Sequence, residues 1–306
     1  MLSIIVPCRN VRELTVECLT SIHGAVTALG LTPRVEYILL DDQSDAGEQI
    51  PELFRQFRAG AGAEVRAWTF KQRQHYTGSF AFGLSRARGD LVLFISNDMH
   101  VTAPWMRTLL AVAAVDRRHG IVRGVANICD SHEYHQVQPP VERGPDDYHA
   151  FAEYLAKAHG LTHVEDTIFS GDAVLIRREL IEKIGVLDTR FYGYFGDPDY
   201  GLRARRAGFK LVCAKGAWLK HYGQGHVKGE HLATGVQMDE LKRARMELVV
   251  AAFEKFRAKW GSPPVPAEPA DLNLWDWPAL LKAPAPKGGE FQNPLPDDGS
   301  IARPIT

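Results

Sequence analysis

Two aspartates flank a proline in the stretch GYFGDPDYGLRARRAG, which covers residues 193–208. Pro198 suits the first turn of a helix, and acidic side chains there interact favourably with the positive end of the helix dipole. Asp197 and Asp199 are therefore explained structurally as residues of a helix start. An aspartate is also a side chain that can take a proton from a hydroxyl group during catalysis. Both interpretations stay open at this point.

Polar loops follow three short apolar runs in the first hundred residues. The runs at residues 2–6, 35–40 and 91–95 have the length and composition of strands, and PCRN, DDQSD and SNDMH follow them in turn. A single aspartate in such a loop commonly caps the next helix. In an open parallel sheet, however, ligands bind beyond the carboxyl ends of the strands, so we expect the three loops to converge there.

Helical patterns separate these runs and predict a parallel sheet with crossover helices. The expected helices cover residues 11–29, 78–88, 104–119, 145–159, 177–185 and 236–260, and further strands are expected at 173–176 and 209–214. Beyond Gly261 the chain is rich in proline and alanine, which predicts an extended wrap or a mobile arm.

The chain has no glycine-rich phosphate loop of the familiar kinds. No Gly-x-x-x-x-Gly-Lys-Ser/Thr occurs, and Gly60-Ala61-Gly62 lacks a third glycine. A P-loop enzyme and a nicotinamide dehydrogenase are therefore disfavoured. If a nucleotide diphosphate binds beside the acidic loops, a cation must separate the negative charges, and Mg²⁺ or Mn²⁺ meets that need.

Composition predicts a soluble globular protein that lies in the cytoplasm. Of 306 residues, 45% are hydrophobic and 24% charged, and the net charge of -1 gives no sign of a nucleic acid partner. Four cysteines without paired spacing are expected to be reduced. No apolar run is long enough for a signal peptide or a membrane span, although peripheral attachment to a membrane through an acceptor or partner is left open.

Six segments in order resemble the family 2 glycosyltransferases, which are inverting sugar-nucleotide enzymes with the GT-A fold. Each segment is a weak pattern, but their order from Ser3 to about Gly261 makes the resemblance specific. The segments are SIIVPCRN (opening strand and nucleotide loop), EYILLDDQSD (acidic turn), LVLFISNDM (Asp-x-Asp metal motif), FSGDAVLIRRELIEKIGVLD (acceptor side), FYGYFGDPDYGLRARRAGF (Glu-Asp-x-Asp region) and LKHYGQGH (late histidine).

The resemblance implies an α/β fold of GT-A type: a Rossmann-like, mostly parallel central sheet flanked by helices, with a helical C-terminal extension. It places a glycosyltransferase domain at residues 1–261. Within that domain, residues 1–100 would be the nucleotide-binding half, 101–230 the acceptor half and 231–261 a C-terminal helix, with a proline-rich extension at 262–306.

The resemblance also assigns catalytic roles. Inverting transfer is one in-line displacement at the anomeric carbon, and one base takes the proton of the acceptor hydroxyl. That base is assigned to Asp197, after the family's glutamate position. Asp199 falls on the acceptor side, although its preferred role is to brace the helix start or to orient Arg203 or Arg205.

A divalent cation, Mn²⁺ or Mg²⁺, is implied at Asp98, which matches the second carboxylate of Asp-x-Asp. Ser96 stands at the first position, and a hydroxyl is a poorer ligand, so the metal is expected to depend on one aspartate, water and phosphate. The resemblance adds His221 as a ligand; without it, a histidine that bonds to a backbone carbonyl explains the residue as well.

For the nucleotide, the carboxylate of Asp41 or Asp42 is expected to accept from the base or the ribose. Arg9 is expected at a phosphate, with an ordinary surface arginine as an equal alternative, and Tyr76 or Arg73 is expected on the base. The full predicted nucleotide set is Pro7, Arg9, Asp41, Asp42, Gly78, Arg86 and Asn97.

On the acceptor side, Asp172 is expected to contact the donor sugar or the acceptor, although an Asx turn explains it equally. Trp105 and Trp218 are candidates to stack on a sugar, but a core position is favoured for each. Gly196 replaces the family's usual glutamate, which leaves acceptor recognition open and allows a degenerate enzyme.

The predicted function is transfer of a sugar, with inversion, from a nucleotide diphosphate donor to a hydroxyl of a glycan, a lipid-linked glycan or a small acceptor, as in polysaccharide biosynthesis. A UDP-linked donor is favoured. Two alternatives stay open: a retaining or nucleotidyl-transferring enzyme on the same scaffold, and a sugar- or nucleotide-binding module that has lost catalysis.

Overall fold

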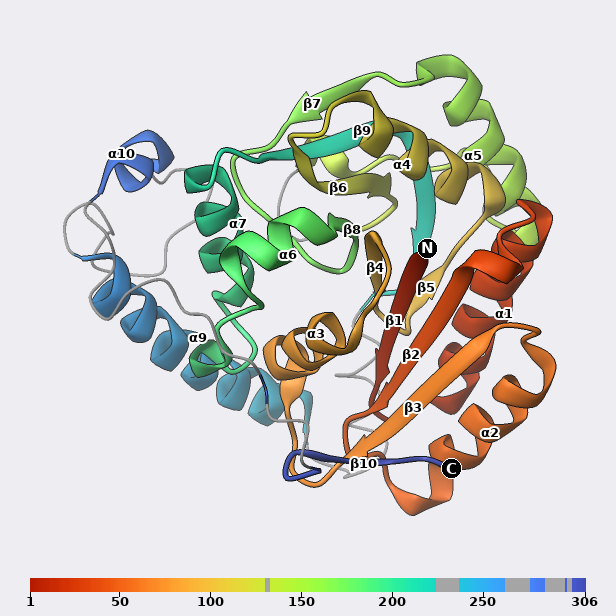
Figure 1. Ribbon diagram of the computed structural model, residues 1–306, viewed down its shortest axis with the longest axis horizontal. Coiled ribbons are helices and arrows are strands. Elements are labelled where there is room, and N and C mark those ends of the chain that lie inside the picture. The colour runs from red at the N-terminus through yellow and green to blue at the C-terminus, as the bar shows by residue number, and fades with distance from the viewer. Residues whose placement is uncertain (130–132, 224–236, 262–275, 284–294, 296–298) are drawn as a thin grey trace.

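The computed structural model describes the chain except for residues 130–132, 224–236, 262–275, 284–294 and 296–298. Among the described residues, strands join into one sheet in the order β10-β3-β2-β1-β4-β8-β6-β9-β5, and β7 pairs with β9 (Figure 1). The strands are β1 Leu2–Cys8, β2 Val35–Asp41, β3 Glu64–Phe70, β4 Leu91–Ile95, β5 Met99–His100, β6 His119–Ala126, β7 His163–Glu165, β8 Ala173–Arg177, β9 Lys210–His221 and β10 Ala302–Pro304.

The centre of the sheet is parallel, which confirms the predicted fold. Strands β3, β2, β1 and β4 are parallel neighbours, and β6 is parallel to β9. Strand β8 is antiparallel to both β4 and β6. The sheet continues through residue 100, so the two predicted halves share one sheet.

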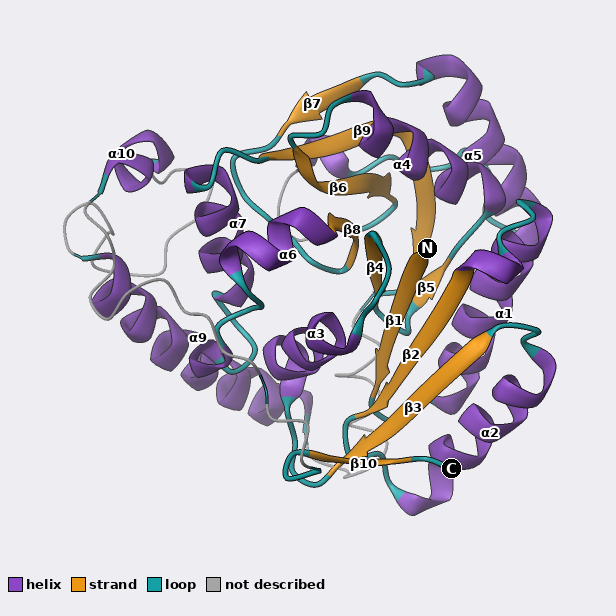
Figure 2. Cartoon of the chain, in the orientation of Figure 1, coloured by secondary structure: helices purple, strands orange, loops and turns teal. Residues whose placement is uncertain are grey.

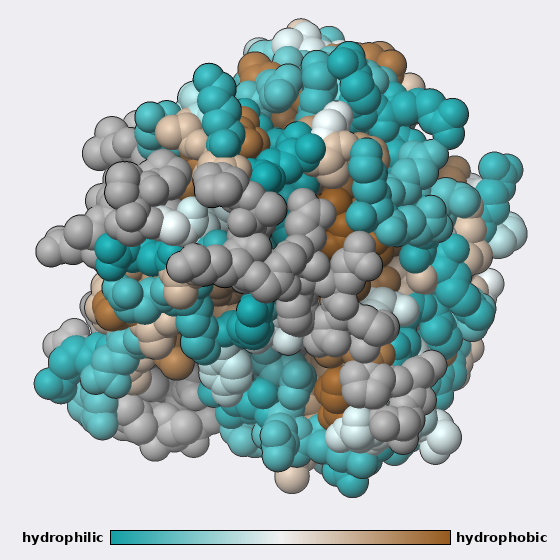
Figure 3. Space-filling model, turned by 60° about the vertical axis from the view of Figure 1, so that its left-hand side comes forward, coloured by the Kyte–Doolittle hydropathy of each residue, from teal (hydrophilic) through white to brown (hydrophobic). Residues whose placement is uncertain are grey.

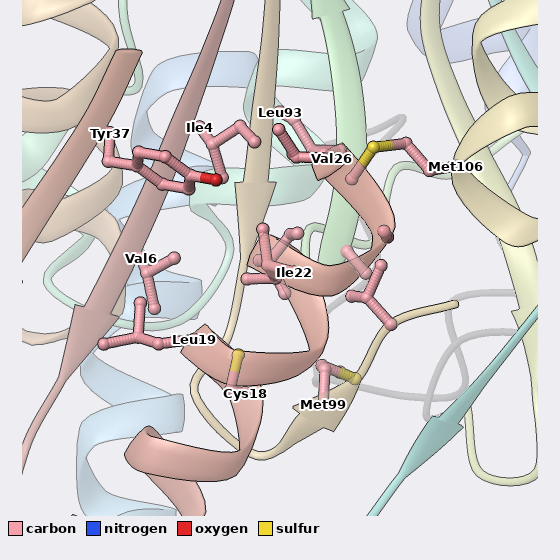
Figure 4. Close-up of a cluster of buried hydrophobic side chains, with 14 of the residues drawn as sticks. Ile4, Val6, Cys18, Leu19, Ile22, Val26, Tyr37, Leu93, Met99 and Met106 are labelled. Atoms are coloured by element: carbon pink, nitrogen blue, oxygen red, sulfur yellow. The ribbon is translucent and has the colours of Figure 1, made fainter. Parts of the chain in front are cut away.

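Helices cover both faces of the sheet (Figure 2). The apolar sides of α1, α2 and α4 pack on one face, and those of α3, α6 and α7 on the other. Figure 4 shows Cys18, Leu19, Ile22 and Val26 of α1 against the strands. The helices are α1 Arg12–Ala28, α2 Ile50–Gly60, α3 His75–Arg86, α4 Ala103–Val115, α5 Pro145–His159, α6 Arg178–Ile184, α7 Gly196–Arg206, α9 Met238–Trp260 and α10 Trp277–Lys282.

One predicted helix extends too far, and strands β3, β5, β6, β7 and β10 and helix α2 were not predicted. The helix expected at 104–119 ends at Val115, and the next eight residues of regular structure, His119–Ala126, form the buried strand β6. Extended backbone at Asp116 and a turn at residues 117–118 separate the helix from the strand. Strand β3 was not predicted because its sequence, EVRAWTF, mixes charged and apolar residues.

The C-terminal residues return to the edge of the sheet. β10 pairs antiparallel with β3, and Arg58 and Arg55 of α2 donate to the carbonyls of Ile305 (2.6 Å) and Thr306 (3.0 Å). Most of the predicted extended tail, and the predicted start of the long helix at residue 236, lie outside the described residues. Within the described part of the chain, no helix combines the length and the apolar character that a membrane span requires.

On the face of the molecule in Figure 3, most of the described surface is hydrophilic, with smaller hydrophobic areas between the hydrophilic ones. Among the described side chains of the long helix α9, those of Ala252, Phe253, Phe256 and Trp260 toward its C-terminal end are buried, whereas Met246 and Val250 are exposed.

Candidate active site

Asp98 and His221 are brought together by the short ladder between β5 and β9. Met99 pairs with His221 in this ladder, and the N–H of Tyr222 donates to the carbonyl of Asp98 at 2.9 Å. As a result, Nε2 of His221 lies 3.3 Å from Oδ2 of Asp98, and both side chains are largely buried. Burial would lower the pKa of His221, but the Asp98 carboxylate outweighs it and raises this pKa to about 9.

Asp172 lies beside this pair, at the start of β8. The N–H of Ser96 donates to its carbonyl at 2.9 Å, in line with the antiparallel pairing of β4 and β8. One carboxylate oxygen of Asp172 is 4.0 Å from Nδ1 of His221, and the other is 3.5 Å from Nη2 of Arg123 in β6. Arg123 is buried, and the attraction of Asp172 overcomes burial and raises the pKa of the guanidinium. The guanidinium therefore stays charged behind Asp172.

Asp197 lies at the start of α7, on the other side of Asp172. Its Oδ2 accepts a 2.9 Å hydrogen bond from the N–H of Gly171, the residue before Asp172. Its Oδ1 is buried and has no well-directed hydrogen bond from a described residue. Burial raises the pKa of Asp197 to about 7, with Asp172 adding to the rise, while the Gly171 N–H and the Tyr76 hydroxyl oppose it. A carboxyl group with this pKa suits a general base near neutral pH.

Two glycines allow α3 to approach Asp197 closely. A Cβ on Gly171 would lie 1.7 Å from the Tyr76 hydroxyl, and a Cβ on Gly196 would lie 2.8 Å from Cγ2 and Oγ1 of Thr77. Thr77 thus fills the space beside Gly196, the position at which the resemblance leads us to expect a glutamate.

The carboxylates of Asp41 and Asp42 are buried and bonded to the protein. Asp41 accepts from the N–H of Ser44 (2.9 Å) and the hydroxyl of Thr69 (3.1 Å). Asp42 accepts from the N–H groups of Gln74 (2.6 Å) and His75 (2.9 Å), which caps the start of α3. Both aspartates therefore shape the loops of the predicted nucleotide site.

Arg9 joins the first two loops at this edge, because its Nη1 donates to the carbonyls of Asp42 (3.1 Å) and Gln43. Asn10, which the sequence did not single out, strengthens the junction. Its side chain bonds to the carboxylate of Asp45 (2.9 Å) and to the N–H of the same residue (2.8 Å). Asn10 and Val11 both adopt left-handed backbone, which for a β-branched valine is strained and is held by its surroundings.

The other predicted nucleotide residues do not all lie at this edge. Pro7 is at the end of β1, the side chain of Asn97 donates to Thr15 (2.9 Å), and Gly78 lies in the first turn of α3. Arg86 is at the opposite end of α3, where its carbonyl accepts from Arg66 at the amino ends of the strands. The structure therefore separates Arg86 from the other predicted nucleotide residues.

Asp199 and the two tryptophans have structural contacts. Asp199 is fully buried and accepts from Arg203 (2.9 Å), as its preferred sequence interpretation predicts, which places it away from an acceptor. Trp105 and Trp218 are fully buried, and Nε1 of Trp218 donates to the carbonyl of Val137 (2.8 Å). Neither ring is exposed for stacking on a sugar.

The side chains of Asp98 and His221 can supply only part of the ligand set of a divalent cation. Among the described residues, no group of three His, Cys, Asp or Glu side chains is arranged to hold a metal ion. Asp98 and His221 supply one carboxylate and one imidazole. Such a pair suits a cation that completes its shell with diphosphate oxygens and water, as Mg²⁺ commonly does.

Arg123 and Thr77 were missed by sequence reasoning. Arg123 is a single cation within the apolar run GIVRGVA, a pattern that indicates a buried partner if the run is a strand. Thr77 carries no such signal in the sequence.

The chain is similar in sequence to curated proteins. Among curated proteins, the O-antigen biosynthesis protein RfbC of Myxococcus xanthus is 23% identical over 278 residues, which are 85% of this chain and 20% of that protein. The inactive polypeptide N-acetylgalactosaminyltransferase-like protein 5 of Macaca fascicularis is 25% identical over 173 residues, covering 53% of this chain and 39% of that protein. The chain thus spans less than half the length of these relatives.

Solved structures share the fold. The mannosyltransferase PcManGT from Pyrobaculum calidifontis, in complex with GDP-Man and Mn²⁺, has a TM-score of 0.54 at 19% identity, over 92% of this chain and 72% of that chain. GalNAc-T7 with UDP, GalNAc and Mn²⁺ has a TM-score of 0.59 at 14% identity, over 93% of this chain and 55% of that chain. These likenesses confirm the predicted GT-A fold. The family model for glycosyl transferase family 2 matches residues 3–185, more than half of the chain, and the chain therefore belongs to that family.

Proposed function

We propose that the chain is an inverting glycosyltransferase that moves a sugar from a nucleotide diphosphate, most simply a UDP-sugar, to a hydroxyl of a glycan or small acceptor. The observation that supports this best is the position of Asp172. It has the Asp98 and His221 pair on one side and Asp197 on the other, with Arg123 behind it. A leaving-group site and a base are thereby adjacent at the ligand-binding edge of a parallel sheet.

Asp197 is the proposed catalytic base. Its Oδ2 is held by Gly171, which leaves Oδ1 to accept the proton of the acceptor hydroxyl. As the acceptor oxygen bonds to the anomeric carbon, the bond from that carbon to the diphosphate oxygen breaks, and the electron pair leaves with the diphosphate. A base whose pKa is about 7 can accept the proton near neutral pH.

Asp98 and His221 are the proposed protein ligands of a divalent cation, Mn²⁺ or Mg²⁺, which when bound neutralises charge on the departing diphosphate. Both relatives of known structure described above were solved with Mn²⁺. Ser96 is too weak a donor to replace a carboxylate, so phosphate oxygens must supply part of the coordination.

The loops around Asp41 and Asp42 form the proposed nucleotide site. Because both carboxylates are bonded to backbone and side-chain donors, they preorganise the loops into which a base and ribose fit. Arg9 lies on the same edge and is the proposed phosphate contact. The acceptor is proposed to be a glycan or a lipid-linked glycan, in keeping with the O-antigen biosynthesis named for the relative RfbC. The proposed location is the cytoplasm.

A second candidate is a nucleotide-sugar binding module without catalysis. Two observations favour it: the space of the family's glutamate is filled by Thr77 beside Gly196, and a curated relative is named as inactive. Oδ2 of Asp197 is nevertheless held by the N–H of Gly171, the residue before Asp172, which keeps this carboxylate at the site that a working base requires.

The test measures turnover of a panel of UDP- and GDP-linked sugars with Mn²⁺. The readout is the release of free nucleotide. A working transferase leaks some sugar to water, so slow hydrolysis of one donor that Asp197→Asn abolishes supports the proposal. Proton NMR of the released or transferred sugar must then show the opposite anomeric configuration from the donor. Retained configuration would contradict inversion, and binding without hydrolysis would favour the inactive module.

A further inference from the structure

The C-terminal end of α9 packs directly on the segment that carries Asp197. Phe256 and Trp260 of α9 lie in one buried cluster with Phe191, which is part of that segment (residues 188–199), and with Leu202 of α7. The matched family region ends at residue 185, so both the segment and the helix lie beyond it. The contact between α9 and this segment therefore lies entirely outside the region that the family model matches.

Lys259 bridges the two ends of this segment. Its Nζ lies 3.1 Å from Oδ2 of Asp188 and 2.5 Å from Oδ1 of Asp199. Trp260 adds a 3.0 Å hydrogen bond from its Nε1 to the same oxygen of Asp199. The two carboxylates are fully buried and Lys259 nearly so. Asp197 lies between the two bridged positions.

Lys259 is not needed to balance charge. Arg190 binds both carboxylate oxygens of Asp188, and Arg203 donates to Asp199 at 2.9 Å. Each buried carboxylate therefore keeps an arginine if Lys259 is removed. What only Lys259 does, among the described contacts of these carboxylates, is to connect Asp188 with Asp199.

The backbone between Asp188 and Asp199 is irregular and needs to be held. Tyr192 and Phe195 both have left-handed backbone, with φ of 55° and 63°. Such conformations cost energy for residues other than glycine and persist where the surroundings fix them. Two fixed ends limit how far the start of α7 can move.

We propose that Lys259 is a positioning residue for the base: it fixes residues 188–199 so that Asp197 stays at its distance from Gly171. This inference rests on the proposed function for its kinetic consequence. A displacement of about 1 Å at a catalytic group can cost about 100-fold in rate. Nucleotide binding is made by other loops, so its affinity should not change.

The test compares Lys259→Met with Lys255→Met in the full chain. Among the described residues, Lys255 of the same helix donates to the carbonyl of Arg190 (2.9 Å). It contacts the same segment without joining Asp188 to Asp199, so Lys255→Met is the control for the loss of one charged contact without loss of the bridge. Three quantities are measured: hydrogen exchange of peptides covering residues 189–198, kcat, and the nucleotide Kd. We expect Lys259→Met to speed exchange in this segment and to lower kcat about 100-fold with Kd within about threefold. Lys255→Met should leave hydrogen exchange and kcat near the wild-type values. Lys259→Arg should recover most of kcat.

Unchanged kcat in Lys259→Met, or faster exchange spread over the whole chain, would overturn the proposal. If Lys259→Met does not fold, Trp260→Phe removes the Nε1 bond to Asp199 together with part of the buried ring, and it should show the same pattern at smaller size. If the wild-type protein turns over no sugar nucleotide, the proposed function fails, while hydrogen exchange still decides whether Lys259 fixes the segment.

Discussion

The N–H of Gly171 donates a 2.9 Å hydrogen bond to Oδ2 of Asp197. Gly171 is followed by Asp172, whose carbonyl accepts from Ser96 in the loop that carries Asp98. One short backbone path therefore links the base at the start of α7 to the loop of the proposed metal site. The distance between the two chemical groups is set by backbone contacts.

Replacing Asp197 by asparagine should lower kcat by about 10² to 10⁴, the usual contribution of a general base. Donor binding should stay within about threefold, because the nucleotide loops are untouched. In the wild type, kcat/KM should rise with pH through about 7, since the carboxylate must be ionised to accept a proton. Initial rates from pH 5 to 9 check this, and a flat profile would contradict the assignment.

Asp197→Asn should also change the pH dependence of stability. The pKa of Asp197 is raised from 3.8 to about 7 on folding, so the folded state loses stability relative to the unfolded state as pH rises between these values. The variant lacks this loss. Its free energy of unfolding relative to that of the wild type should therefore be higher at pH 8 than at pH 4, by about 1 kcal/mol or more. Urea unfolding at the two pH values measures it; an equal difference at both would argue against a buried carboxyl group.

Tyr76→Phe should move the acid side of the rate profile to higher pH. The hydroxyl of Tyr76 lowers the pKa of Asp197, whereas burial raises it. Removing the hydroxyl should therefore raise the pKa of Asp197 further. Tyr37→Phe is the matched control, because the hydroxyl of Tyr37 is also buried but has no hydrogen-bond partner among the described residues and belongs to the core on the other face of the sheet. The prediction is wrong if both variants give the wild-type profile.

Asp172→Asn should move the same limb to lower pH. The negative charge of Asp172 raises the pKa of Asp197. Asp172 also lies 3.5 Å from the guanidinium of Arg123, and the positive charge of Arg123 lowers the pKa of Asp197. Removing the carboxylate therefore acts in one direction on Asp197. Asp116→Asn, at an exposed turn, serves as the control. A shift to higher pH in Asp172→Asn would show that the charges around Asp197 are arranged differently.

Gly196→Ala should destabilise the protein by about 1–3 kcal/mol, as overpacking of a buried site does. The new Cβ would lie 2.8 Å from two atoms of Thr77. Adding Thr77→Ala should restore more than half of the lost stability, because it removes both atoms. Chemical unfolding of the two single variants and the double variant gives the coupling, and additive effects would rule out the contact.

The fold was predictable because its strands alternate with helices and its resemblance runs in order along the chain. The failures have local causes. The strand His119–Ala126 contains histidine, arginine and two glycines, so it lacked a strand pattern and was joined to the preceding helix. Arg123 was hidden with it.

The candidate site was predictable where a motif names the residue, as for Asp98, His221 and Asp197. Their mutual distances were not, because pairing of β5 with β9 joins residues far apart in the sequence. The bonds that bury Asp41 and Asp42 come from Ser44, Thr69 and the start of α3, which sequence position alone does not reveal. Arg86 was misplaced for a similar reason, since a twelve-residue helix carries its two ends to opposite edges of the sheet.

The most direct test of the central claim is a calorimetric titration of UDP, GDP and dTDP into the protein, with Mn²⁺ and then with EDTA, repeated on Asp98→Ala. The account predicts that one nucleotide binds with Mn²⁺, that EDTA weakens this binding at least about tenfold, and that Asp98→Ala abolishes the effect of the metal. Absence of binding by all three nucleotides, in protein shown to be folded, would contradict a nucleotide-sugar site at the carboxyl ends of these strands.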